Sequence, residues 1–156
     1  EREVTDMKEI LHILDNSKVV HVGLVDGDEP YVVPMNYGYI LEDGLTIYLH
    51  AATQGYKLDL IRNNPKVFLE MECDLAPIEG KLPCQYGMSY RCLMANGIAE
   101  IVEDVEEKKQ ALSILMKTQT GKDFEFNDKL VSIVSVIKIH VAEYTAKANH
   151  IAEGEQ

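Results

Sequence analysis

A lysine near the start of a short helix is the residue of this sequence best placed to hold an anion. Residues 47–49 are β-formers, residues 50–55 form a small polar turn, and a helix with Leu58, Leu60 and Ile61 on its apolar side follows, which residues 63–65 stop. This pattern predicts a strand, a turn that ends in Gly55, and a helix with Lys57 in its first turn. Free N–H groups at a helix start favour anions, and Lys57 adds a full charge. The segment indicates a phosphate site, although many helices with a nearby lysine bind nothing.

Two other stretches carry residues suited to a binding site, PYVVPMNY at 30–37 and YRCLMANG at 90–97. Pro34 interrupts a predicted strand, and a proline there belongs at an edge or a bulge because it donates no ladder hydrogen bond. Such a strand offers unpaired N–H and C=O groups to a flat heterocycle, and Arg91 offers a second cation. A flat ring at one end and a phosphate at the other describe flavin mononucleotide (FMN). The alternative is that these stretches are core strands and turns.

His50 is the candidate catalytic residue. It ends a predicted strand ahead of a small-residue turn, so its ring can face a pocket rather than the core. Its ordinary pKa of about 6.5 allows proton transfer near neutral pH. The spacing supports proton delivery or substrate contact about as well as simple packing beneath a ligand.

No metal site is predicted from the local spacing of possible ligands. Five histidines occur, and none pairs with another at metal-ligand spacing: His12, His21, His50, His140 and His150. The sequence also lacks the glycine-rich nucleotide motifs and the zinc-protease motif.

The composition narrows the possible partners. The chain has 156 residues, a formal net charge of −11 and a pI of about 4.8. This length fits one domain spanning residues 1–156, and the acidic charge argues against nucleic acid or an anionic membrane as a partner. The three cysteines form no disulfide pattern and indicate a reducing cytoplasm.

The hydrophobic pattern predicts about six strands, mostly joined by hairpins, and three helices. The expected strands are 19–25, 29–40, 45–49, 67–71, 90–102 and 131–144. Residues 74–87 contain Pro77, Gly80 and Pro83 and are expected to form a long loop. The last two strands carry apolar residues on both faces, which indicates a closed barrel. One barrel interior covers one face only, so the other face is expected to meet a partner subunit.

The order of these stretches resembles the pyridoxamine 5′-phosphate oxidase-like flavin-binding split barrels, and more narrowly their 5-nitroimidazole-resistance branch. The matching segments are 23–25, 28–37, 47–57, 60–67, 90–91, 97–99, 102–108 and 145–148. The resemblance extends from Glu3 to Asn149. It implies a mainly β fold, a six-stranded antiparallel FMN-binding split barrel with flanking helices. It also implies a homodimer with FMN at the subunit interface.

The resemblance assigns the flavin contacts to three groups of residues. Along the isoalloxazine it places Val33, Pro34, Met35, Asn36 and Tyr37. Near the ring and the ribityl chain it places His50, Ala51 and Thr53, and at the phosphate Gly55, Tyr56 and Lys57. The resemblance also implies that Arg91 and Cys92 approach the flavin, either from the same subunit or from the partner subunit.

The chain departs from the full oxidase at several of these positions. Val33 occupies an arginine position, Tyr56 replaces a second cation beside Lys57, and Cys92 stands where relatives often carry Ser or Gln. The oxidase's C-terminal substrate-binding segment has no counterpart, so oxidation of pyridoxamine phosphate is not expected. The implied function is an FMN-dependent oxidoreductase that passes electrons to a small acceptor such as a nitroaromatic or a quinone. The alternative is a non-catalytic protein that binds flavin, haem or a deazaflavin.

Overall fold

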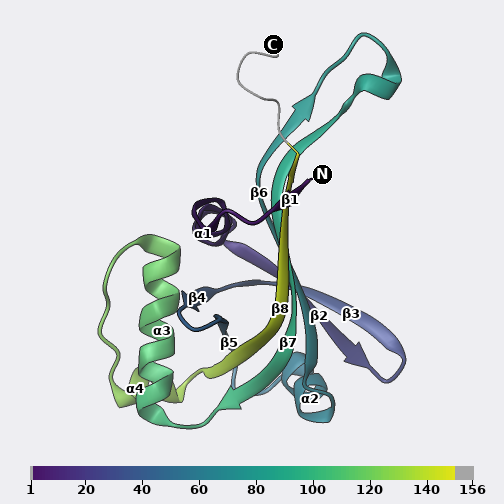
Figure 1. The fold of residues 1–156 in the computed structure, drawn as a ribbon. Helices are drawn as coiled ribbons and strands as arrows, with labels where there is room; N and C mark the ends of the chain where they lie inside the picture. Colours follow the sequence, from purple (N-terminus) through teal and green to yellow (C-terminus); the bar gives the residue numbers. More distant parts are fainter. Residues whose placement is uncertain (1, 150–156) are drawn as a thin grey trace.

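The computed structural model describes residues 2–149 and shows a curled antiparallel sheet of eight strands with helices around it (Figure 1). The strands are β1 (Glu3–Val4), β2 (Val19–Asp26), β3 (Glu29–Asn36), β4 (Gly38–Leu41), β5 (Leu45–Ala51), β6 (Lys66–Ile78), β7 (Gly87–Val102) and β8 (Ser135–Asn149). The helices are α1 (Met7–Asn16), α2 (Tyr56–Asn63), α3 (Val105–Thr120) and α4 (Asp128–Ser132), with a 3₁₀ turn at Pro83–Gln85.

The strand order explains how the sheet closes into a split barrel. Along the sheet the order is β3-β2-β6-β7-β8-β5-β4, and β1 pairs with the far end of β8. The sheet curls so that β3 returns toward β5 without a ladder between them. The prediction of a mainly β antiparallel barrel with flanking helices is confirmed. The predicted number of six strands is wrong among the described residues, which contain eight.

The expected strand 29–40 is in fact two strands. Pro34 does not interrupt β3, where it pairs with His21, and it lies on an edge strand as a strand proline should. The break falls at Tyr37, and β4 then begins at Gly38. A Cβ atom at Gly38 would lie 2.5 Å from the Cα of Leu115, so only glycine lets the chain pass this close to α3.

The barrel interior holds the main hydrophobic core. Alternate residues of β2 point inward, as the period of two in a strand requires, and the core face of this strand consists of Val20, Val22 and Leu24. α1 contributes Ile10, Ile13 and Leu14, and α2 contributes Leu58, Leu60 and Ile61. The two helices therefore bury their apolar sides against the same core.

A second, smaller core lies between the sheet and the helices α3 and α4. It consists of Tyr48, Val102, Ala111, Leu112, Val131 and Val136. Val131 belongs to α4, which Asn127 caps by accepting a hydrogen bond from the Leu130 N–H, so the expected start of the last strand at 131 is wrong. Helices of the same chain thus cover part of the apolar surface that the sequence assigned to a partner subunit.

The expected loop 74–87 is mostly a projecting hairpin. β6 continues to Ile78 and β7 begins at Gly87, with a register shift between Cys73 and Ala76. This arm extends beyond the barrel at the top of Figure 1. The prediction failed because Pro77 is a turn signal locally but is accommodated in the paired arm, opposite Met88.

None of the helices within residues 2–149 is long and apolar enough to cross a membrane.

Candidate functional site

The start of α2 combines uncapped backbone N–H groups with a nearby lysine. Residues 52–55 connect β5 to the helix, and Gly55, at its N-cap, has a φ of 157° that L side chains rarely adopt. No side chain caps the helix start, so its first N–H groups keep their hydrogen-bonding capacity. Lys57 is half-buried in the first turn and forms no ion pair within the described part of the chain. The arrangement agrees with the strand, turn and helix that the sequence predicts.

Tyr56 fixes this helix start to the β2–β3 hairpin. Its ring meets Tyr31 edge-to-face with centroids 5.1 Å apart, and its hydroxyl donates a hydrogen bond to the Asp26 carboxylate. That hydrogen bond raises the pKa of Tyr56. The side chain of Tyr56 therefore points toward the hairpin. Only the backbone N–H of Tyr56 remains at the start of α2. The contact joins two distant parts of the sequence, the β2–β3 hairpin and the start of α2, and no local pattern in the sequence predicts it.

The segment Val33–Tyr37 offers mainly backbone groups and two side chains. Val33 and Met35 lie on the core side of β3, opposite Val22 and Val20, whereas Pro34 and Asn36 are exposed. β3 is the edge of the sheet, so half of its N–H and C=O groups point away from β2. These free groups are what a flat heterocycle requires for pairing along one edge.

The side chain of Tyr37 belongs to the hydrophobic core. It is fully buried, and its hydroxyl donates a hydrogen bond of 2.5 Å to the carbonyl oxygen of Leu14. Burial raises the pKa of the Tyr37 hydroxyl well above its ordinary value. Its carbonyl oxygen accepts a hydrogen bond from Nε2 of Gln119, so Tyr37 offers a ligand no exposed group within one chain.

His50 and Ala51 diverge at the end of β5. Ala51 is buried in the barrel core, while His50 is exposed and lies on the α3 side of the strand with Tyr48. His50 borders a hollow of about 250 Å³ whose other lining residues are Leu112, Leu115, Met116, Phe126, Leu130, Ile133 and Val134. The expectation that the ring faces a pocket agrees with this placement. Thr53 is exposed in the turn between β5 and α2.

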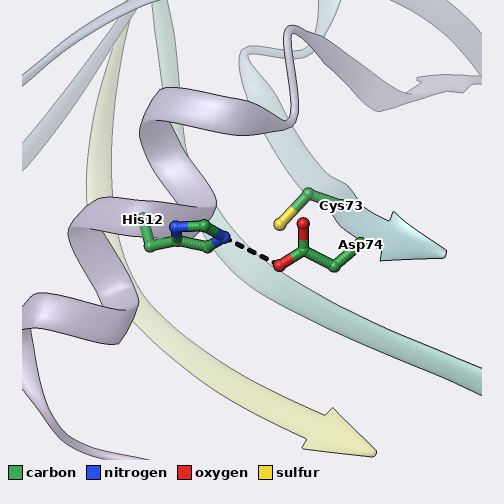
Figure 2. Close-up of side chains that lie close together, drawn as sticks. All are labelled: His12, Cys73 and Asp74. Atoms are coloured by element: carbon green, nitrogen blue, oxygen red, sulfur yellow. Dashed lines mark hydrogen bonds and ion pairs between the residues drawn. The ribbon is translucent and has the colours of Figure 1, made fainter. Parts of the chain in front are cut away.

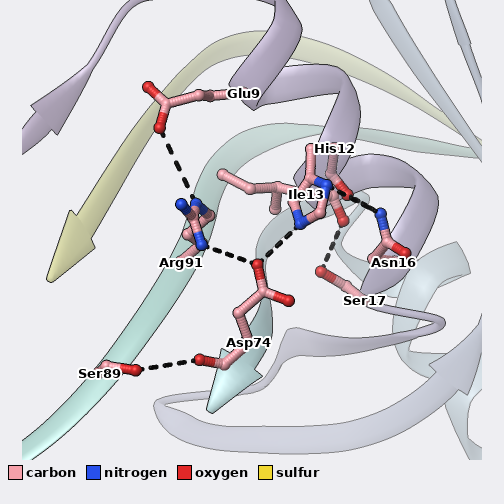
Figure 3. A network of polar contacts seen from close by, with 8 residues as sticks. All are labelled: Glu9, His12, Ile13, Asn16, Ser17, Asp74, Ser89 and Arg91. Carbon is pink, nitrogen blue, oxygen red and sulfur yellow. Dashed lines mark hydrogen bonds and ion pairs between the residues drawn. The ribbon is translucent and has the colours of Figure 1, made fainter. Parts of the chain in front are cut away.

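Arg91 lies in a different region, in a network at the α1 end of the barrel (Figure 3). Its guanidinium is 2.9 Å from a carboxylate oxygen of Asp74 and 3.9 Å from Glu9. The same Asp74 oxygen is 2.7 Å from Nε2 of His12. Burial alone would raise the pKa of Asp74, but the hydrogen bonds from His12 and Arg91 outweigh it and lower that pKa. The network holds the base of the arm against α1.

A neighbouring thiol does not turn this network into a metal site. Cys73 lies next to His12 and Asp74 (Figure 2), so the three offer a nitrogen, a sulfur and an oxygen at close range. Burial raises the pKa of the Cys73 thiol to about 11. The Asp74 oxygen that faces His12 already accepts from two donors, and one of them is the Arg91 cation, which occupies the place of a metal ion. The group is therefore structural.

Within one chain, Arg91 and Cys92 do not join the other predicted site residues. Ile98 pairs with Lys66, just beyond α2, and Ile98 lies seven positions along β7 from Arg91, roughly 23 Å in a strand. Cys92 points to the opposite face of β7, where its register partners are Glu72 and Lys147. One chain thus brings together β3, the end of β5 and the start of α2, and leaves Arg91 and Cys92 elsewhere.

The sequence contains a family signature that agrees with this geometry. The model of the pyridoxamine 5′-phosphate oxidase family matches residues 6–148, and the chain belongs to this family. Comparison with curated proteins gives no match.

Solved structures support the same assignment. A candidate 5-nitroimidazole antibiotic resistance protein from Bacteroides thetaiotaomicron is 32% identical, with a TM-score of 0.79 over 95% of this chain and 90% of that one. The FAD and haem binding protein from Mycobacterium smegmatis has a TM-score of 0.83 at 15% identity, over 97% of this chain and 75% of that one. An FAD-binding protein from Mesorhizobium loti has a TM-score of 0.67 at 20% identity, over 96% of this chain and 98% of that one. The likeness to the last two concerns the fold alone.

Proposed function

We propose that this protein is a cytoplasmic, homodimeric FMN-binding oxidoreductase that passes electrons to a small acceptor such as a nitroaromatic or a quinone. The observation that carries the proposal is the start of α2, where Lys57 has no carboxylate partner within residues 2–149 and no side chain caps the helix. A cation beside free N–H groups suits a phosphate monoester. Structural relatives described as FAD-binding support a flavin on this fold, and the three free cysteines fit a reducing compartment.

The phosphate would be held by the backbone of Gly55 and Tyr56 and by the side chain of Lys57. Tyr56 helps indirectly, because its contacts with Tyr31 and Asp26 fix the helix start against the β2–β3 hairpin. Ala51 and Thr53, between β5 and α2, would border the ribityl chain. A seat fixed before binding loses less conformational entropy when the ligand arrives.

The ring would lie along the free edge of β3. Of the predicted segment, Val33–Asn36 presents main-chain groups there, with Pro34 and Asn36 as its exposed side chains, and Tyr37 lies buried beyond the strand end. When bound, the flavin supplies the redox chemistry, and the protein orients it and excludes water. His50 would deliver a proton to the acceptor or contact it, because it is exposed beside an apolar hollow.

A second copy of the chain would complete the site with Arg91 and Cys92. Their distance along β7 from the α2 end keeps them away from the other contacts of their own chain. An exposed apolar surface for such pairing exists on the outer face of the sheet. Val32, Phe68 and Ile98 lie on this face and are 63%, 53% and 45% exposed. Stable homodimers bury large apolar interfaces, above roughly 2,000 Å².

The absorption spectrum of the purified protein, followed by turnover, tests the function. Flavin bands that are bleached by a reductant and restored by a nitroaromatic or quinone are the expected result. A Soret band would identify a haem protein instead, and flavin bands without acceptor reduction would identify a non-catalytic flavin-binding protein. Either outcome would overturn the proposed activity.

A further inference from the structure

Three metal-ligating side chains meet on the outer face of the sheet, and none of them belongs to the proposed flavin contacts. His21 is on β2, and Glu70 and Glu72 are on β6. Glu70 is the register partner of His21, and Glu72 is two residues further, so all three project from the same face. Nδ1 of His21 lies 3.1 Å from Oε1 of Glu70 and 3.5 Å from Oε2 of Glu72.

This group has more acceptors than donors. Nδ1 of the imidazole carries at most one hydrogen, and its hydrogen bond is to Glu70. Oε2 of Glu72 is buried and has no hydrogen-bond partner in the described residues. A buried carboxylate oxygen without a donor is costly. A cation at the point where the three side chains converge would satisfy it.

We infer that His21, Glu70 and Glu72 form a binding site for a divalent transition-metal ion such as Zn²⁺. Ligand atoms about 2.1 Å from such an ion are roughly 3.0–3.4 Å apart at octahedral or tetrahedral angles. Of the two separations from His21, 3.1 Å lies within this range and 3.5 Å lies just above it. One imidazole nitrogen with two carboxylate oxygens favours Zn²⁺, Mn²⁺ or Fe²⁺ over Ca²⁺ and Mg²⁺, which prefer oxygen alone. Three protein ligands leave at least one position for water or another ligand.

Access and rigidity both suit such a site. In the single chain the side chains of His21, Glu70 and Glu72 are 37%, 36% and 30% exposed, so an ion can approach the group from solvent, although Oε2 of Glu72 is itself buried. They project from directly paired strands, which fixes their spacing better than loops would. The site needs no flavin, so its test is independent of the proposed function.

Two other histidine–carboxylate groups serve as controls, because one lacks a second carboxylate and the other already contains a cation. His140 is 2.8 Å from Glu100 on the same sheet, but no second carboxylate joins them within 2–149. His12 is bonded to Asp74, whose carboxylate is shared with Arg91. A positive charge already occupies the place that an ion would take there.

Titration calorimetry with Zn²⁺, after dialysis of the whole protein against a chelator, tests the site. We expect one site per chain with micromolar or tighter affinity. His21→Ala and Glu72→Gln should each weaken it at least about tenfold, while His12→Ala and His140→Ala should leave it unchanged. Thermal melts show whether each variant is folded. If His21→Ala does not fold, the near-isosteric Glu72→Gln still tests the site.

Two results would overturn the inference. One is the absence of Zn²⁺ binding below 100 µM in the wild-type protein. The other is wild-type affinity in the folded Glu72→Gln variant, which would assign any bound zinc to other side chains. Co²⁺ provides a spectroscopic check, because its visible absorption bands should appear with the wild-type protein and change with Glu72→Gln.

Discussion

The two ends of the barrel differ in whether their charged side chains are paired. At the α1 end, the Asp74 carboxylate lies between His12 and Arg91, and Glu9 adds a second, longer contact to the arginine. At the α2 end, Lys57 is half-buried without a partner in the described chain, beside a helix start without a side-chain cap.

The difference separates a structural network from a binding site. Within one chain, charges that are already paired hold elements together, here the arm and α1. Partial burial of an unpaired cation costs free energy in the empty protein. The interaction with a bound anion offsets this cost. Substitution of Lys57 should therefore alter ligand binding, and substitution of Asp74 should alter stability.

The largest effect is expected from His50→Ala at the α2 end. If His50 delivers a proton, the variant should retain the flavin but reduce a nitro or quinone acceptor about 10²–10⁴ times more slowly. If His50 only packs beside the cofactor, flavin occupancy should fall and the rate per bound flavin should stay constant. Flavin occupancy and single-turnover acceptor reduction, measured on the same sample, separate the two. Full occupancy with an unchanged rate would remove His50 from the site.

A smaller effect, at least about tenfold in affinity, is expected from Lys57→Glu. The variant replaces an attractive partner of the phosphate with a repulsive one, and a charged hydrogen bond contributes about 1.5–3 kcal/mol. Titration of the apoprotein should show weaker binding of FMN and unchanged binding of riboflavin, which has no phosphate. Lys66→Glu, at the exposed start of β6, is the matched control and should change neither. Equal FMN affinity in wild type and Lys57→Glu would show that the phosphate seat is misplaced.

At the α1 end, Asp74→Asn should lower the free energy of unfolding by about 1 kcal/mol. Asp74 has a φ of 57°, which asparagine tolerates, so the substitution removes the charge and leaves the backbone unstrained. Because its pKa is lowered in the folded chain, the contribution of Asp74 is present at neutral pH and is lost as the pH falls. Urea unfolding measures the loss, and Asp59→Asn, in an exposed pair with Arg62, should cost less. A loss no larger than this control would mean that the network does not stabilise the fold.

The smallest effect is expected at Glu70, an acid that lacks a full counter-charge. Burial, and next the neighbouring Glu72, raise the pKa of Glu70 from 4.5 to about 7. Between these values the folded chain binds more protons than the unfolded one, so this group destabilises the fold as the pH rises from 5 to 8. The other groups that face it are His21, Cys92 and Lys147.

Glu70→Gln removes this titration. With a chelator present, its melting temperature relative to wild type should rise between pH 5 and pH 8, by less than about 4 °C because the group is partly solvated. Glu143→Gln, at an exposed acid of β8 that forms no ion pair within the described residues, is the matched control and should show no such trend. A constant difference between Glu70→Gln and wild type across this range would contradict the assignment.

Local patterns in the sequence were sufficient to predict much of the fold. Alternating apolar residues specified β2, and the strand, turn and helix from Ile47 to Pro65 are present as β5 and α2. The predictions failed where a long-range contact decides the outcome. Pro77 was read as part of a loop because its pairing with Met88 across the arm has no local signature. Val131 was assigned to a strand because its place in α4 depends on the Asn127 cap and on packing under α3.

The candidate site was predictable only in part, for the same reason. Lys57 and His50 follow local turn and helix signals, and their placement agrees with the expectation. The contact of Tyr56 with Tyr31 and Asp26, and the convergence of His21 with Glu70, depend on strand pairing between distant segments. Histidine spacing along the chain could not reveal the second group, because its ligands come from two strands. His150, one of the five histidines considered, lies outside the described residues.

Sedimentation equilibrium of the FMN-loaded protein, recorded at 280 nm and at the flavin band, tests the central claim most directly. The account predicts a dimer at micromolar concentration, with flavin absorbance that sediments with it at two FMN per dimer. Each site would then combine the α2 end of one copy with Arg91 of the other. A monomer that retains stoichiometric FMN, or a dimer without flavin, would contradict the shared site.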